Sequence, residues 1–189
     1  MMTDLAEPLA LGTQRTRSPR ARTLGMLVAG VLGGLGLGII ARAWMRLITE
    51  DPEFTWTGTI FIVIGFMVFG LTQSIVAVAR RRPKRRWKLT IVRAVGAVGM
   101  LPLFVAAGAL MLPTVVGGGL AVARVDWHTL TRSIWLLLAA APVLFVGSEL
   151  IDAFGWSMQM VAGFVMMSAV YSTIIWATRW TFAPQSDSP

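Results

Sequence analysis

Five long apolar stretches constrain this chain more than any other feature of its sequence. They cover about residues 24–48, 56–79, 89–112, 130–151 and 155–180. A helix needs about 20 apolar residues to cross the hydrocarbon core of a bilayer, so each stretch is long enough. Only 14% of the residues are charged, whereas soluble domains contain about 25%. The sequence therefore predicts an all-α, polytopic helical membrane protein with five transmembrane helices.

A single membrane domain is expected over residues 23–181. The polar segment 1–22 has no apolar period and predicts a disordered basic cytoplasmic tail, and residues 182–189 are expected to form a second disordered tail. The first apolar stretch has two interpretations, because Ala41-Arg42-Ala43 has the small-x-small form of a signal-peptide cleavage site. A retained first helix is favoured over a cleaved one, since the helical pattern continues to Ile48.

A block of basic residues predicts the orientation of the helices. Residues 79–88 hold seven of the 17 Lys and Arg residues and lie between the second and third apolar stretches. Such a block stays on the cytoplasmic side of a membrane, where Arg80–Lys88 would contact anionic lipid headgroups. Five helices then place the N-terminus in the cytoplasm and the C-terminus outside a bacterial plasma (inner) membrane. Because this role accounts for the net charge of +8, nucleic acid is not an expected partner.

Two connections between the apolar stretches are informative. Residues 113–123 are too few to cross a membrane and contain Gly117-Gly118-Gly119, which weakens a helix. We expect a loop on the outer face there, and a re-entrant segment is the alternative. The last two stretches are separated only by Asp152-Ala153-Phe154, which predicts a tight helical hairpin on the cytoplasmic side.

Three glycines in the first stretch, Gly30, Gly34 and Gly38, recur every four residues and so share one face of the helix. Small residues at this spacing let a second helix approach closely. This glycine ridge suits either a dimer interface or packing within the chain, and packing within the chain is favoured.

Charged residues in an expected outer layer are the first candidates for a binding site. Arg42 and Arg46 lie one turn apart near the outer end of the first helix, close to Glu50 and Trp56. Guanidinium groups bind phosphates and carboxylates bidentately, so these residues are candidates for contacts with an anionic ligand. The favoured alternative is that both arginines reach the membrane surface and pair with the acidic loop.

A second polar layer, expected near the cytoplasmic side, contains Gln73, Arg93, Glu149 and Asp152. Glu149 and Asp152 are three residues apart and share a helical face, from which both can pair with Arg93. The functional interpretation of this layer is an ion or proton relay. A structural ion pair that docks the last hairpin is favoured.

Motifs for catalysis or metal binding are missing from the sequence. It contains no cysteine and only one histidine, His128, which leaves too few ligands for a zinc or haem site. Nucleotide-binding, hydrolase and metalloprotease motifs do not occur. We therefore expect no enzyme activity, no metal and no organic cofactor.

Residues 41–59, ARAWMRLITEDPEFTWTGT, followed by an apolar helix and a basic loop, resemble a segment of small integral membrane proteins of actinobacteria. The resemblance covers mainly residues 41–88. It implies a lineage and draws attention to Arg42 and Arg46, and it implies no mechanism.

The expected function is that of a non-catalytic membrane component, an accessory subunit or lipid-interacting protein. Its expected partners are membrane lipids, a second membrane protein or further copies of itself. The alternative is a small oligomeric transporter or channel for a small or anionic solute. A water-filled cavity that joins Arg42 and Arg46 to Glu149 and Asp152 would favour transport.

Overall fold

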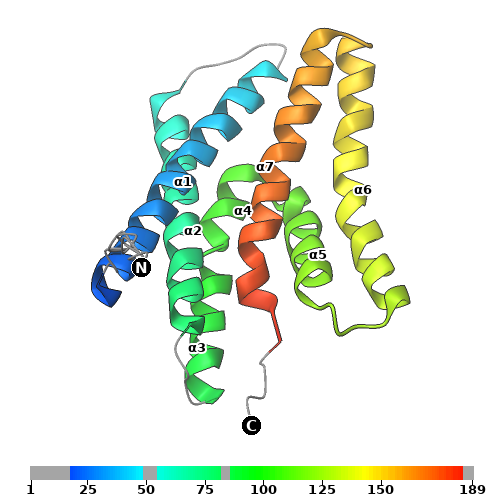
Figure 1. The fold of residues 1–189 in the computed structure, drawn as a ribbon. Coiled ribbons are helices and arrows are strands. Elements are labelled where there is room, and N and C mark those ends of the chain that lie inside the picture. Colours follow the sequence, from blue (N-terminus) through cyan, green and yellow to red (C-terminus); the bar gives the residue numbers. More distant parts are fainter. Residues whose placement is uncertain (1–17, 49–54, 82–85, 185–189) are drawn as a thin grey trace, which may run out of the picture.

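Helices make up most of the described part of the chain, which comprises residues 18–48, 55–81 and 86–184 of this computed structural model. No strand occurs in these ranges, which confirms the all-helical fold class. In chain order the elements are α1 (Pro19–Leu47), α2 (Trp56–Arg80), α3 (Arg86–Val98), α4 (Leu101–Ala107), the 3-10 helix η1 (Ala109–Met111), α5 (Leu112–Ala123), α6 (Thr129–Phe154) and α7 (Met158–Phe182) (Figure 1).

The first helix begins earlier than its apolar stretch indicates. The Ser18 side chain accepts a hydrogen bond from the backbone N–H of Ala21 at 3.3 Å, and Pro19 occupies the first turn. Serine at the cap followed by proline is a strong start signal for a helix. Residues 19–22 are therefore helical rather than part of a disordered tail. The rest of the predicted tails, residues 1–17 and 185–189, lies outside the described residues.

Four of the described helices, α1, α2, α6 and α7, are long and apolar enough to cross a membrane by length and composition. They correspond to four of the five predicted transmembrane stretches. The remaining stretch, predicted as one helix over residues 89–112, is divided among α3, α4 and η1. The prediction of five spanning helices is therefore not confirmed.

Glycine and proline residues explain why this stretch is divided. A β-carbon on Gly99 would lie 2.1 Å from Oγ1 of Thr72 in α2, so the chain passes very close to α2 directly after α3. Pro102 and Pro113 lie in the first turns of α4 and α5, a position that suits proline but does not continue a preceding helix. Gly108, between them, has a φ of +88°, which favours glycine.

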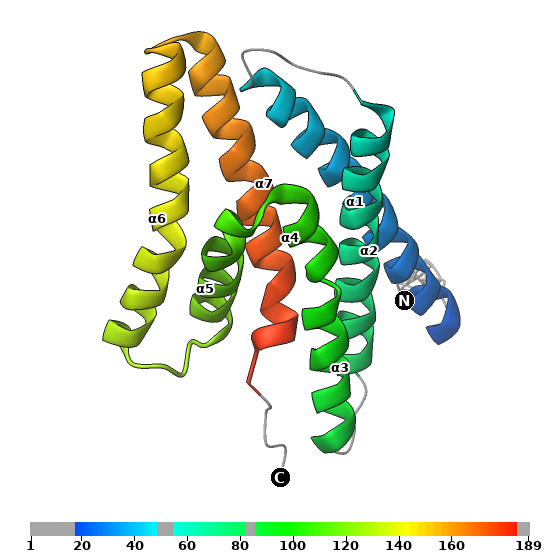
Figure 2. The same ribbon diagram turned by 180° about the vertical axis from the view of Figure 1, so that it is seen from behind.

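Together, α3, α4, η1 and α5 form a helical hairpin that enters the bundle and returns to the end from which it started (Figures 1 and 2). Met100, Leu103 and Met111, near the turn of this hairpin, are buried in the core. Residues 113–123, predicted as a loop on the outer face, belong instead to α5, and Gly117-Gly118-Gly119 are all buried. The loop prediction is wrong because glycine, although a weak helix former, lets α6 and α7 approach α5 closely.

Two hydrogen bonds between distant parts of the chain show which helix ends lie together. Gln159 at the start of α7 donates from Nε2 to the carbonyl oxygen of Leu47 at the end of α1, at 2.6 Å. After the opposite end of α7, the Ala183 carbonyl accepts from Arg80, the last residue of α2. We call the end with Arg80 and Ala183 the basic end, and the end with Leu47 and Gln159 the distal end. Helix α6 starts at the basic end and finishes at the distal end (Figure 1).

Helices α1 and α2 form a close antiparallel pair through the glycine ridge. A β-carbon on Gly30 would lie 1.7 Å from Oγ of Ser74, and one on Gly34 would lie 2.3 Å from the carbonyl oxygen of Phe66. Gly38 faces α2 in the same way. The structure thus places all three glycines against another helix of the same chain.

Helix α7 lies at the centre of the fold and packs against α1, α2, α3, α5 and α6. Its residues Met167, Tyr171 and Ile174 are buried in the core together with Trp44 of α1 and Phe66 of α2. Trp44 and Tyr171 meet edge to face, with ring centres 6.3 Å apart, which is a preferred arrangement of aromatic pairs. These contacts fix the position of α7 and with it the position of Ala183 at the basic end.

Candidate anion-binding site

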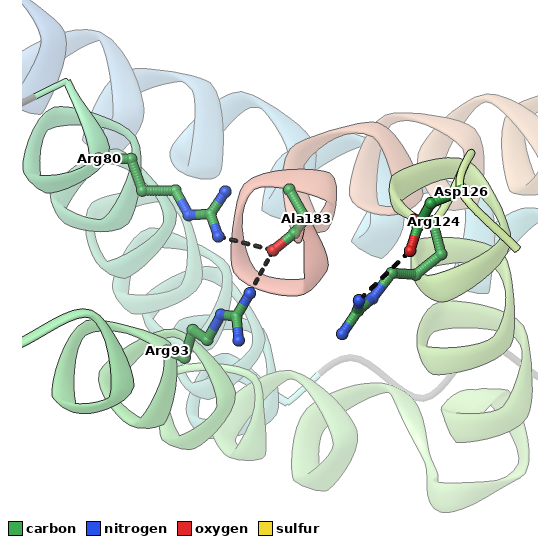
Figure 3. A network of polar contacts seen from close by, with 5 residues as sticks. All are labelled: Arg80, Arg93, Arg124, Asp126 and Ala183. Carbon is green, nitrogen blue, oxygen red and sulfur yellow. Dashed lines mark hydrogen bonds and ion pairs between the residues drawn. The ribbon is translucent and has the colours of Figure 1, made fainter. Parts of the chain in front are cut away.

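Two arginine side chains meet at the end of α7 (Figure 3). Arg80 ends α2, and Arg93 belongs to α3. The Nη2 atoms of both side chains donate hydrogen bonds to the carbonyl oxygen of Ala183, and the bond from Arg80 measures 2.6 Å. One backbone oxygen therefore joins α2, α3 and the end of α7.

Arg124, directly after α5, completes a group that we call the arginine cluster (Arg80, Arg93 and Arg124). Its Nη1 atom lies 3.8 Å from Oδ2 of Asp126, and its guanidinium carbon lies 5.5 Å from the centre of the Trp127 ring. A long, partly exposed ion pair of this kind contributes little stability. Figure 3 shows Arg124 across from Arg80 and Arg93, and the one carboxylate drawn with these three guanidinium groups, that of Asp126, pairs with Arg124.

The Nε atoms of all three arginines are buried and have no hydrogen-bond partner. Buried polar groups in proteins nearly always have a partner, and an unpaired donor costs about 1–3 kcal/mol. The cluster thus combines excess positive charge with unused donors. Both properties suit an oxyanion such as phosphate, which accepts several charge-assisted hydrogen bonds.

The arginine cluster also has a structural effect. Carbonyl groups at the C-terminal end of a helix carry partial negative charge, and nearby cations stabilise them. Arg80 and Arg93 therefore hold the end of α7 against α2 and α3. Each uses one of its N–H groups for Ala183, and a guanidinium has five, so further donors remain for a ligand.

The described members of the predicted outer layer lie at the end of α1 and the start of α2, away from the arginine cluster. Arg42 donates from Nε to Oγ1 of Thr59 at 3.1 Å, and Arg46 is exposed and has contacts of its own. Trp56, at the start of α2, is 71% exposed, and Glu50 lies outside the described residues. Neither of the two cavities described below is lined by Arg42, Arg46 or Trp56.

Gln73, from the predicted inner layer, is buried in α2 and uses both ends of its amide. Its Nε2 atom donates to the carbonyl oxygen of Gly96 at 3.2 Å, and its Oε1 atom accepts from the Thr181 hydroxyl at 2.8 Å. These bonds join α2 to α3 and α7. Gln73 therefore has a structural role near the arginine cluster.

The other members of the predicted inner layer are separated. Arg93 lies at the basic end, whereas Glu149 and Asp152 are exposed in the last turns of α6 at the distal end. The predicted pairing of these carboxylates with Arg93 is therefore wrong. Its physical cause is the hairpin of α3 to α5, which returns the chain to the basic end and so reverses the direction expected for α6 (Figure 2).

The sequence places Arg80 in the basic block, whereas five crossings and an outer loop over residues 113–123 would place Arg124 on the opposite side of the membrane. Only the return of the α3–α5 hairpin brings the two side chains to one end. The signal for this return is the order Pro102, Gly108, Pro113, because two proline starts around a glycine divide an apolar stretch into short helices.

No family model, curated protein or solved structure matches this chain. The resemblance of residues 41–88 to small actinobacterial membrane proteins therefore stays a prediction. Within the described ranges, no group of three or more His, Cys, Asp or Glu side chains is suited to a metal ion. The geometry of the basic end is thus the main guide to function.

Proposed function

We propose that the basic end faces the cytoplasm of a bacterial plasma membrane and that the N-terminus lies on the same side. Helices α1, α2, α6 and α7 cross the bilayer in this arrangement, and the α3–α5 hairpin enters from the cytoplasmic side and returns. Arg124, Arg132 and Arg179, which five crossings would place outside, then lie inside together with the basic block. The turn between α6 and α7, which follows Asp152 and lacks Lys and Arg, lies outside, in line with the positive-inside rule.

We further propose that the protein is a non-catalytic membrane component that binds the phosphate of an anionic lipid through the arginine cluster. One observation carries this proposal: guanidinium groups from α2, α3 and the end of α5 gather at the basic end, and the ion pair that the described residues form there joins only Arg124 to Asp126. A purely structural network would contain more neutralising partners, because unpaired charges away from water are costly. Lipid phosphates are the anions that a cytoplasmic membrane surface supplies at this level.

The transport alternative has weaker support. Arg42 and Arg46 lie near the end of α1, and Glu149 and Asp152 lie near the end of α6, which are both at the distal end. A path between these two pairs would therefore not cross the membrane.

Native mass spectrometry of the protein released from nanodiscs tests the lipid-binding proposal. The nanodiscs contain phosphatidylglycerol and phosphatidylcholine in equal amounts, and the parent protein is expected to retain phosphatidylglycerol. Each basic residue near an anionic surface contributes about 1 kcal/mol, which is roughly fivefold in affinity. The triple variant R80Q/R93Q/R124Q should therefore bind phosphatidylglycerol roughly 100-fold more weakly.

A matched control removes the same charge from exposed positions of the same end. The variant R20Q/R22Q/R81Q changes three exposed arginines and measures the general attraction of basic residues to the anionic surface, so it is expected to weaken the retention of phosphatidylglycerol clearly less than R80Q/R93Q/R124Q does. Thermal unfolding of all three proteins shows whether each variant is folded. Equal retention by the two folded triple variants would refute a specific role for the arginine cluster.

A further inference from the structure

A groove opens between α5, α6 and α7 on the surface of the bundle. Its volume is about 500 Å³, within the range of small-molecule sites. The lining is mainly apolar, with Val122 of α5, Leu136, Ala140 and Leu144 of α6, and Ile175 of α7 among its members. In a membrane-spanning protein, a groove of this composition suits a hydrocarbon chain.

Two arginines border the groove towards the basic end. The guanidinium carbon of Arg179 lies 4.0 Å from the ring centre of Trp176, a residue that lines the groove. Arg132 precedes Leu136 by one turn of α6, and its Nε donates to the carbonyl oxygen of Ala121 at 3.2 Å. Both cations are thus held next to the apolar lining.

Neither of these two charges is neutralised within the described part of the chain. The ion pair found there joins Arg124 to Asp126 and involves neither Arg132 nor Arg179. The Nε atom of Arg179 is also buried without a hydrogen-bond partner. Stacking on Trp176 orients the guanidinium and attracts it, but leaves its charge available. The groove therefore combines positive charge at one end with an apolar surface along its length, which is complementary to an amphipathic anion.

The length of the groove matches one leaflet of a bilayer. Leu136 and Leu144 on α6 are eight residues apart, and so are Ser168 and Trp176 on α7. At about 1.5 Å per residue these helix segments span about 12 Å. Half of the hydrocarbon core of about 30 Å is about 15 Å, so a chain that starts at the arginines ends near the middle of the bilayer.

We infer that this groove binds one acyl chain of an anionic glycerophospholipid whose phosphate lies at Arg132 and Arg179. The inference rests on the proposed orientation and on the proposed preference for anionic lipid, but it uses residues outside the arginine cluster.

A second cavity provides an internal comparison. It has a volume of about 380 Å³, begins at Leu144 and continues between α6 and α7 past Phe164 to Trp156. The lining residues Ser148 and Ile151 are followed in the sequence by Glu149 and Asp152, so acidic residues adjoin this cavity where arginines adjoin the groove. The residues that the structure shows lining this distal cavity are thus largely apolar, and none of them carries a positive charge.

Photo-crosslinking with two lipid probes tests the inference. Phosphatidylglycerol and phosphatidylcholine that carry the same diazirine-labelled acyl chain are placed in nanodiscs with the full protein, and mass spectrometry maps the crosslinked residues. We expect the groove to be labelled at least fivefold more by the phosphatidylglycerol probe, and the distal cavity to be labelled equally by both probes. Equal labelling of the groove by the two probes, or no labelling there, would overturn the inference.

Matched variants test the two parts of the site. Ala140 lines the groove and Ala141 is exposed beside it, so A140W should reduce groove labelling about tenfold and A141W should leave it unchanged. The variant R132Q/R179Q should remove the preference for phosphatidylglycerol while the distal cavity is labelled as before. A preference that persists in R132Q/R179Q would refute the assigned phosphate position. The probe map of the parent protein remains decisive if A140W fails to fold.

The same probes separate this inference from the proposed function. Suppose that R80Q/R93Q/R124Q loses its retained lipid while the groove of the parent protein shows no preference for phosphatidylglycerol. Lipid binding by the arginine cluster is then supported, and the groove assignment is refuted. If that variant keeps all of its lipid and the groove still prefers phosphatidylglycerol, the groove assignment stands and the role of the arginine cluster fails.

Discussion

Gln73 illustrates how a single polar side chain can connect several helices inside an apolar bundle. Its amide bonds to Gly96 of α3 and Thr181 of α7, and the side chain is only 5% exposed. A buried amide without partners is costly because neither lipid nor an apolar core offers hydrogen bonds. The position of Gln73 therefore favours one arrangement of α2, α3 and α7 over others.

The substitution T181V tests this connection at the residue scale. Valine removes the hydroxyl that donates to Gln73, so the free energy of unfolding is expected to fall by about 1 kcal/mol, near the upper part of the range for hydrogen bonds between membrane helices. Thermal or denaturant unfolding in detergent measures the change. T173V is the matched control, because the Thr173 hydroxyl is exposed and bonds only to Ala169 of its own helix. Equal stability of T181V and T173V would contradict the prediction.

At the scale of elements, the contact between α1 and α2 depends on glycine. The backbone of Gly34 lies so close to α2 that its added β-carbon would meet the Phe66 carbonyl oxygen at 2.3 Å. A backbone oxygen cannot move aside as a flexible side chain can. A larger residue at this position must therefore separate the two helices.

The pair of variants G34L and G33L tests this contact. G34L is expected to lower the free energy of unfolding by about 3 kcal/mol, because overpacking of a close helix contact has costs of this order. No atom lies within 4 Å of a β-carbon added at Gly33, so G33L should unfold like the parent. Unfolding of both variants under the same conditions supplies the measurement, and a stable G34L would show that α1 does not pack on α2 through this face.

The apolar stretches were sufficient to predict α1, α2, α6 and α7, because length and hydropathy alone identify a spanning helix. They were not sufficient for residues 89–123. Breaks at Gly99 and Gly108 depend on the close approach of α2 and on a left-handed backbone, and neither property is visible in average hydropathy. The arginine cluster depends on this hairpin, so the sequence identifies its members as basic residues but does not predict that they are neighbours.

At the scale of the whole molecule, the hairpin determines which loops share a side of the membrane. With four crossings, the connection between α5 and α6, which contains Val125, lies on the side of the basic end, and the turn between α6 and α7, which contains Trp156, lies on the opposite side (Figure 1). With five crossings and a cytoplasmic basic block, the two assignments are exchanged. The two arrangements therefore make opposite predictions for the same pair of residues.

Single cysteine variants distinguish these arrangements, because the chain contains no cysteine of its own. Val125 and Trp156 are 71% and 84% exposed, so V125C and W156C both present an accessible thiol. A membrane-impermeant maleimide is expected to label W156C in intact cells and V125C only after permeabilisation. R81C, in the basic block, serves as the cytoplasmic control. Labelling of V125C in intact cells, and of W156C only after permeabilisation, would support the five-helix arrangement.

The central position of α7 has a consequence for the biogenesis of the protein. Synthesis proceeds from the N-terminus, so α7 is the last of the described helices to leave the ribosome. Until it inserts, Gln73, Arg80 and Arg93 lack the partners that Thr181 and Ala183 provide. The earlier helices thus lack part of their hydrogen bonding until α7 packs against them. A nascent chain interrupted before α7 would keep these polar groups without the partners that α7 supplies.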